Sequence, residues 1–108
     1  DGISLRVPVV SGSIADITFI SSRNTSVEEV NQILKDAANN PRWKGIFSTT
    51  EEDIVSSDIV GNTYASIADL QMTRVVDGNL VKVLAWYDNE IGYTNSLLLH
   101  TLEAGKNL

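Results

Sequence analysis

The sequence feature that most constrains the fold is a tight-turn signal, Asp-Gly-Asn at residues 77–79, between two strand-like runs. The runs, residues 71–76 and 80–88, are rich in valine, leucine and other residues that are common in strands. Asp-Gly tolerates the positive φ angles that a tight hairpin turn requires. The sequence therefore predicts two neighbouring antiparallel strands. The second run is apolar on both faces apart from Lys82, so we expect it to be central in its sheet.

The clearest helix signal lies upstream of this hairpin. Ser26 and Glu29 have the spacing of a capping box, in which each residue satisfies a free backbone N–H at the helix start. Apolar residues then follow at helical spacing: Val27, Val30, Ile33, Leu34 and Ala37. The Asn-Asn-Pro run at residues 39–41 ends the helix, because a proline disfavours helical geometry in the residue before it.

Strand-like patterns also occur in five other segments, of which the last two could instead be irregular: residues 4–10, 14–21, 44–50, 53–61 and 64–70. A second helix is expected to begin near Glu90 or Ile91 and to end near Gly105. We thus expect about seven strands and two helices. This pattern is typical of an α+β fold with a mainly antiparallel sheet, its helices on one face and a C-terminal helix.

Composition excludes several classes of function. The chain of 108 residues carries a net charge of −6, and its eight basic residues are scattered, so we expect no nucleic-acid partner. There is no cysteine, which excludes disulfides, thiolate metal sites and a cysteine nucleophile within these residues. No spacing of metal ligands is visible, and no apolar run is long enough to cross a membrane. We expect neither a metal nor a membrane partner.

Few residues in the chain suggest chemistry of their own. His100, the single histidine, has no visible nucleophile partner, so a packing or capping role is favoured over catalysis. No glycine-rich phosphate loop is present. Arg6 has two interpretations: an arginine whose stem packs while its head reaches water, or an anion ligand whose planar fork of donors suits phosphate. From the residues alone, the first is favoured.

The junction WYDNEIGYTN, residues 86–95, also has two interpretations. In the first, Asp88 or Asn89 caps the final helix, Glu90 complements the positive end of the helix dipole, and the two aromatic residues lie in a core or an interface. In the second, Asn89 presents an amide that both donates and accepts hydrogen bonds, and Tyr93 supplies a flat wall beside it. The two interpretations are compatible with each other.

These residues also resemble a known family. WYDNEIGYTN closely resembles the Trp-Tyr-Asp-Asn-Glu signature of phosphorylating glyceraldehyde-3-phosphate dehydrogenases. ISLRVPVVSGSIADITF (residues 3–19) is similar to the family's Arg-Val-Pro segment and the strand after it. KGIFSTTEEDIVSSDIVGNTYASIAD (residues 44–69) and GNLVKVLAWYDNE (residues 78–90) resemble its later segments. Four matches in the correct order over nearly the whole chain make the resemblance specific.

The resemblance implies a fragment of a larger two-domain subunit. Residues 1–108 would be the C-terminal portion of the catalytic domain, without the Rossmann domain and without the segment that carries the cysteine nucleophile and the histidine base. The family enzyme is a cytoplasmic homotetramer of glycolysis. It oxidises glyceraldehyde 3-phosphate with NAD and inorganic phosphate to 1,3-bisphosphoglycerate. The chain alone is expected to be inactive and to expose apolar surface that promotes self-association.

The resemblance also assigns individual residues. Arg6 matches an arginine that binds phosphate groups, Asn89 matches the asparagine that hydrogen-bonds the nicotinamide carboxamide, and Tyr93 matches a tyrosine near that ring. No catalytic residue is carried over. Tyr64 and Ile91 depart from the usual family pattern. Two alternatives remain open: a fragment of the related erythrose-4-phosphate dehydrogenase, and a free-standing binding or assembly module without catalysis.

Overall fold

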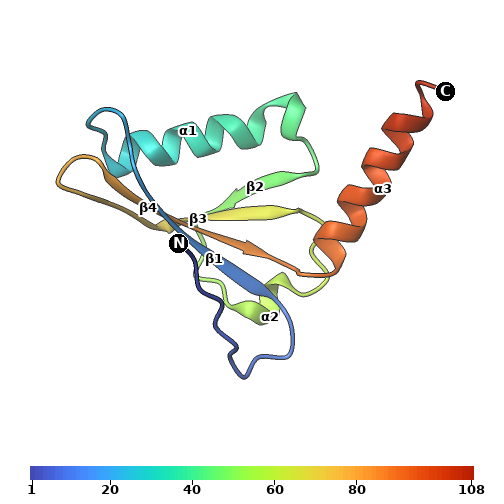
Figure 1. Ribbon diagram of the computed structural model, residues 1–108, viewed down its shortest axis with the longest axis horizontal. Coiled ribbons are helices and arrows are strands. Elements are labelled where there is room, and N and C mark those ends of the chain that lie inside the picture. The colour runs from blue at the N-terminus through green and yellow to red at the C-terminus, as the bar shows by residue number, and fades with distance from the viewer.

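A computed structural model describes residues 1–108 as a four-stranded sheet with α1 across one face and α3 at one end (Figure 1). The elements are β1 (Ser13–Ile20), α1 (Val27–Asn39), the 3₁₀ turn η1 (Pro41–Trp43), β2 (Phe47–Thr50), α2 (Ser56–Ile59), β3 (Ser66–Val76), β4 (Leu80–Tyr87) and α3 (Ile91–Gly105). The strand order is β1-β4-β3-β2, with β4 antiparallel to both neighbours and β2 parallel to β3. The predicted α+β fold with a mainly antiparallel sheet is confirmed.

The hairpin between β3 and β4 forms as the Asp-Gly signal predicts. Asp77 and Gly78 have φ angles of 50° and 77°, so both adopt the left-handed conformation that a tight hairpin turn needs. Val76 on β3 pairs with Leu80 on β4. The central position of β4 is also confirmed, because it lies between β1 and β3 and its residue Val81 is fully buried.

One long strand, β3, replaces two predicted elements. Residues 64–70 and 71–76 carry separate patterns because the pairing of β3 with β4 is interrupted by a bulge. Asp69 pairs with Leu84 and Arg74 pairs with Lys82, so four residues of β3 stand opposite one residue of β4. Because of the extra residues, the apolar–polar alternation before the bulge is out of phase with the alternation after it. A single strand was therefore not recognisable from the sequence.

Helix α1 covers β2 and β3 on one face of the sheet, and its start shows a modified capping box. The Ser26 hydroxyl accepts a hydrogen bond from the Glu29 N–H at 3.2 Å, as predicted. The Glu29 carboxylate does not reach back to the cap; it accepts from Arg23 at 2.5 Å and from Thr25 at 2.6 Å. These bonds, from Arg23 first and Thr25 second, lower the pKa of Glu29 to about 2.

Residues 4–10, predicted as a strand, form an irregular segment without strand pairing, with bends at Pro8 and Val10 and a hydrogen bond from the Val9 N–H to the Val7 carbonyl oxygen at 2.9 Å. The apolar side chains of this segment stay exposed, with Leu5 78% and Val7 54% accessible. Pro8 has no N–H to donate, and no neighbouring strand of this chain offers hydrogen bonds to the segment. Strand propensity alone therefore does not produce a strand, because a strand also needs a partner.

Two helices also differ from the predictions. Residues 53–61 contain the short helix α2, whose start is closed by a hydrogen bond from the Val55 N–H to the Asp58 carboxylate at 2.8 Å. Helix α3 begins and ends where the sequence predicts, but it runs away from the end of β4 rather than over the sheet (Figure 1). Of the two predicted helices, α1 alone lies across a sheet face.

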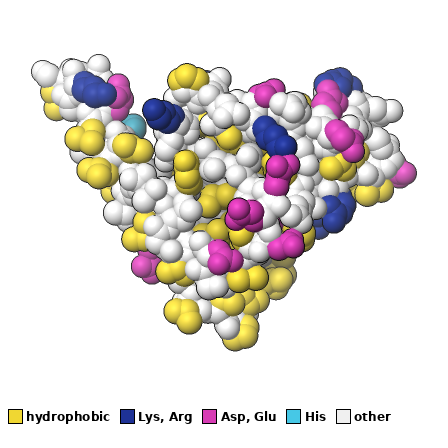
Figure 2. Space-filling model, turned by 180° about the vertical axis from the view of Figure 1, so that it is seen from behind, with side chains coloured by type: hydrophobic (Ala, Val, Ile, Leu, Met, Phe, Trp, Pro, Cys, Tyr) yellow, Lys and Arg dark blue, Asp and Glu magenta, His cyan; other side chains and the backbone are white.

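Much apolar surface is left uncovered, as expected. Hydrophobic side chains stand along the arm that carries the single histidine, which is α3, and gather at the lower tip of the molecule (Figure 2). On α3 the exposed residues include Tyr93, Leu97, Leu98, Leu99 and Leu102, and on β1 they include Ile17 and Phe19. Surface of this extent marks an interaction face. None of the helices is both long and apolar enough to pass through a lipid bilayer.

Candidate functional site

The junction between β4 and α3 is organised by one buried carboxylate. Asp88 is 4% exposed, and its Oδ1 atom accepts hydrogen bonds from the N–H groups of Glu90 and Ile91, both at 2.8 Å. Its Oδ2 atom accepts from the Gly61 N–H at 2.9 Å. These backbone hydrogen bonds, from Ile91 first and then from Gly61 and Glu90, lower the pKa of Asp88. The sequence predicts Asp88 or Asn89 as the N-cap of α3, but the N-cap residue is Glu90, whose side chain makes no cap hydrogen bond. Asp88 instead accepts from the N–H groups of Glu90 and of Ile91, the first residue of the helix.

The loop of residues 60–65 is fastened to the start of α3 at two more places. Gly92 is buried, and a Cβ atom added to it would lie 2.6 Å from the Tyr64 carbonyl oxygen. The Asn95 amide donates to the Thr63 carbonyl oxygen at 3.2 Å. Only glycine fits at position 92, because a side chain there would meet backbone atoms. Loop 60–65 and the first turns of α3 therefore form one packed unit.

Asn89 lies on the exposed side of this unit. Its Oδ1 atom accepts a hydrogen bond from the Gly12 N–H at 3.3 Å, while its Nδ2 atom has no partner within the chain. Gly12 has a φ angle of 90°, and a Cβ atom added there would lie 3.1 Å from the Ser56 carbonyl oxygen. Asn89 thus has one amide atom held by the backbone and one donor free for a ligand.

The structure brings together two of the three residues singled out by the resemblance. Tyr93 lies in the first turn of α3, four residues after Asn89, and its ring is 70% exposed. Arg6 lies in the irregular segment of residues 1–12, is exposed and makes no hydrogen bond or ion pair. The contact between Gly12 and Asn89 joins the end of this segment to the junction.

Other residues show no catalytic geometry. His100 is exposed on α3 and has no hydrogen-bond partner, so the structure does not show the packing or capping role that the sequence favours. No group of three or more histidine or carboxylate side chains is arranged to hold a metal ion.

The sequence did not indicate that the Trp86 indole donates to the buried Asp69 carboxylate at 3.0 Å, since the two residues are far apart in the chain.

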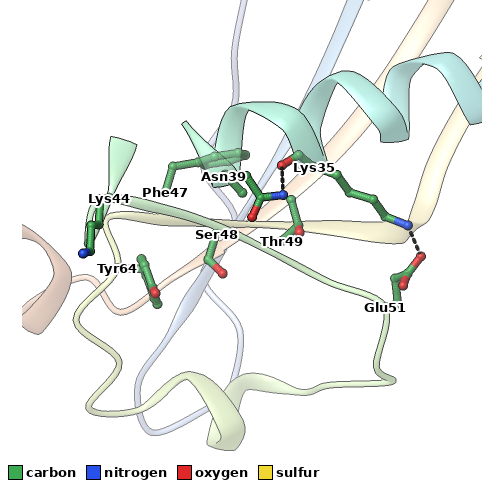
Figure 3. Close-up of a pocket in the computed structure, with 10 residues that line it drawn as sticks. Lys35, Asn39, Lys44, Phe47, Ser48, Thr49, Glu51 and Tyr64 are labelled. Carbon is green, nitrogen blue, oxygen red and sulfur yellow. Dashed lines mark hydrogen bonds and ion pairs between the residues drawn. The ribbon is translucent and has the colours of Figure 1, made fainter. Parts of the chain in front are cut away.

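The larger of the two principal pockets lies away from the junction, between the C-terminal half of α1 and β2 (Figure 3). Its volume is about 460 Å³, and its lining is mostly polar. Lys35 extends along one side and pairs with Glu51 at 2.6 Å, so its charge is already neutralised. Lys44 and Tyr64 stand at the other end. None of Arg6, Asn89 and Tyr93 lines this pocket.

Comparison with known proteins identifies the family of the chain. Residues 1–89 match the family model described as "Glyceraldehyde 3-phosphate dehydrogenase, C-terminal domain". The chain belongs to this family. Of the three predicted binding residues, the matched range includes Arg6 and Asn89, whereas Tyr93 lies beyond it.

Alignments with individual members of the family cover most of this chain. The chain is 44% identical over 91% of its length to glyceraldehyde-3-phosphate dehydrogenase of Borreliella burgdorferi, and covers 30% of that protein. It is 50% identical over 85% of its length to the enzyme of Thermotoga maritima, and covers 27% of it. It is 40% identical over its whole length to the enzyme of Zymomonas mobilis, and covers 32% of it. The chain thus spans about a third of the length of these curated relatives.

Proposed function

We propose that this chain is the C-terminal portion of the catalytic domain of a phosphorylating, NAD-dependent glyceraldehyde-3-phosphate dehydrogenase. The observation that carries the proposal is the family match over residues 1–89, together with relatives of that name that are about three times as long. The complete enzyme would oxidise glyceraldehyde 3-phosphate with inorganic phosphate as a cytoplasmic homotetramer. The Rossmann domain and the cysteine nucleophile would lie in the part of the protein outside these residues.

The residues at the junction fit the nicotinamide end of NAD. A carboxamide offers a carbonyl oxygen and an amino group, and Asn89 offers a free Nδ2 donor beside an Oδ1 acceptor that Gly12 holds in place. The exposed ring of Tyr93 supplies a flat apolar surface one helical turn further on. NAD, when bound, accepts the hydride that leaves the substrate. Asn89 and Tyr93 would bind and orient its nicotinamide.

The side chain of Arg6 is free to bind an anion. Its guanidinium is always charged, offers a planar fork of donors, and is not engaged by any carboxylate of the chain. A free arginine head is what a phosphate ligand requires. We propose that it binds the phosphate of the substrate or inorganic phosphate.

The proposal is tested in the full-length protein with matched variants. Asn89→Ala is expected to raise the KM for NAD and lower kcat, because nicotinamide is then held less well. Arg6→Ala is expected to raise the KM for phosphate or for the aldehyde instead, by about tenfold or more. Unchanged steady-state kinetics for Asn89→Ala would remove this residue from the cofactor site.

The isolated chain provides a second test. Without a cysteine it is expected to reduce no NAD in the presence of glyceraldehyde 3-phosphate and phosphate, and turnover by a pure sample would contradict the proposal. The intact mass of the native polypeptide distinguishes an enzyme portion from a free-standing module. A comparison of glyceraldehyde 3-phosphate with erythrose 4-phosphate as substrates of the full-length protein distinguishes the two dehydrogenases.

A further inference from the structure

Asn89 is flanked in the chain by a residue that does more than cap a helix. Asp88 accepts three backbone hydrogen bonds, two from its own junction and one from Gly61, a residue 27 positions earlier in the chain. Holding the start of α3 uses the first two only, which come from the N-cap residue Glu90 and the first helical residue Ile91. The third ties a separate loop to the junction, and such a tether calls for an explanation beyond helix capping.

The three hydrogen bonds to Asp88 restrain the backbone on both sides of Asn89. The hydrogen bonds from Glu90 and Ile91 to Asp88 Oδ1, both 2.8 Å, bend the chain into a tight turn that has Asn89 at its corner. The bond from Gly61 to Oδ2 fixes this turn against loop 60–65. Because Asp88 is 4% exposed, water does not compete effectively for these bonds.

Two further contacts make the loop a firm support. Gly92 approaches the Tyr64 carbonyl so closely that no side chain fits between them, and Asn95 donates to the Thr63 carbonyl. From the opposite side, Gly12 donates to Asn89 Oδ1 at 3.3 Å. The side-chain amide of Asn89 is thus held by one backbone group, the Gly12 N–H, while the backbone on both sides of Asn89 is fixed against loop 60–65, and the Nδ2 donor is left free.

We infer that Asp88 is a positioning residue: by tying loop 60–65 to the β4–α3 junction, it fixes the direction in which Asn89 presents its amide to nicotinamide. This inference rests on the role proposed for Asn89. Asp88 itself is 4% exposed, and both of its carboxylate oxygens are already occupied by backbone N–H groups. Its effect on binding passes entirely through the geometry of its neighbour.

The test uses the full-length protein and four variants. Asp88→Asn keeps an acceptor for the helix start, but its amide nitrogen cannot accept from Gly61. We expect the KM for NAD to rise about tenfold with little change in the KM for the aldehyde. In the double variant Asp88→Asn/Asn89→Ala, the KM for NAD should equal that of Asn89→Ala alone, since both changes remove the same positioned amide.

Ser26→Ala is the matched control. It removes a side-chain cap from α1, whose start packs beside the β3–β4 turn at the opposite end of β4. We expect it to lower the thermal midpoint of the full-length protein by about 2 °C without changing the KM for NAD. An increase of the same size in the KM for NAD in Ser26→Ala would show that general destabilisation explains the Asp88 effect, and would overturn the inference.

The outcomes separate this inference from the proposed function. An unchanged KM for NAD in Asn89→Ala overturns both. A raised value in Asn89→Ala together with an unchanged value in Asp88→Asn, or with fully additive effects in the double variant, overturns the inference alone. If Asp88→Asn does not fold, Asp88→Ser keeps a short acceptor for the helix start and loses the tether to Gly61, and the same comparison applies to it.

Discussion

The β4–α3 junction and the segment of residues 1–12 carry the two parts of the candidate site, and the chain treats them differently. At the junction, Asp88 is buried and accepts three backbone hydrogen bonds. In the segment, Arg6 is exposed and unpaired, and only Gly12 is joined to the rest of the site. The chain therefore fixes the junction that carries Asn89, whereas it offers Arg6 no hydrogen bond or ion pair that would fix its side chain.

The largest effect is expected from a substitution that forces loop 60–65 and α3 apart at the junction. Gly92→Ala would place a Cβ atom 2.6 Å from the Tyr64 carbonyl oxygen, so α3 and loop 60–65 must separate. We expect a loss of about 3 kcal/mol in the free energy of unfolding and a fall of about 15 °C in the thermal midpoint.

Gly105→Ala, at the other end of α3, is the control for this change. A Cβ atom added there meets nothing within 4 Å, and alanine favours the helix by about 0.5 kcal/mol over glycine. Equal midpoints for the two variants, measured by circular dichroism on heating, would contradict the close approach seen at Gly92.

Hydrogen exchange sharpens the comparison without any mutation. In the isolated chain, we expect most amides of residues 3–10 to exchange at nearly the unprotected rate, and those of Gly61, Glu90 and Ile91 about 100-fold more slowly. In the full-length protein, residues 3–10 should gain protection while the junction changes little. Protection of the segment already in the isolated chain would show that Arg6 needs no outside contact.

Acid titration compares the junction with the start of α1. The pKa of Asp88 and that of Glu29 are both lowered in the folded chain, the latter to about 2. A carboxylate with a lowered pKa stabilises the fold above its ordinary pKa, and this stabilisation is lost as the pH falls through the folded value. We therefore expect the urea midpoint to fall as the pH drops from about 4.5 to about 2. Asp88→Asn and Glu29→Gln should each reduce that fall, and an unchanged pH profile in both would contradict these assignments.

The smallest effect is expected far from both regions. Lys82 on β4 pairs with Asp16 on β1 at 2.7 Å, but the two side chains are 42% and 53% exposed. Lys82→Gln should change the free energy of unfolding by less than about 0.5 kcal/mol. Urea denaturation gives this value, which serves as the baseline for the junction variants. A loss above 1 kcal/mol would require a contribution beyond this exposed pair.

The fold was predictable where local signals are strong. The positive φ angles at Asp77 and Gly78, and the helix cap at Ser26, follow from residue types at fixed spacing. The failures occur where structure depends on distant partners. Residues 4–10 have the composition of a strand and no strand to pair with, and the bulge in β3 depends on its register against β4.

The candidate site shows the same division. That an acid holds the start of α3 was predictable because an acid before a helix is a local signal, but the N-cap residue is Glu90 rather than the predicted Asp88 or Asn89. The tether from Asp88 to Gly61 and the contact between Asn89 and Gly12 span 27 and 77 residues. No local pattern encodes such contacts, so they became visible only in three dimensions.

The strand order also has a consequence for synthesis of the chain. In β1-β4-β3-β2, the first strand pairs only with the last one, and Ile20 meets Leu80 across 60 residues. At a translation rate of 5–20 residues per second, β1 waits about 3 to 12 s for its partner to be made. During that time its backbone edge has no strand from this chain to pair with. Strand β1 is therefore paired only after β4 has been made. A ribosome that stalls before residue 80 leaves the edge of β1 unpaired and prone to aggregation.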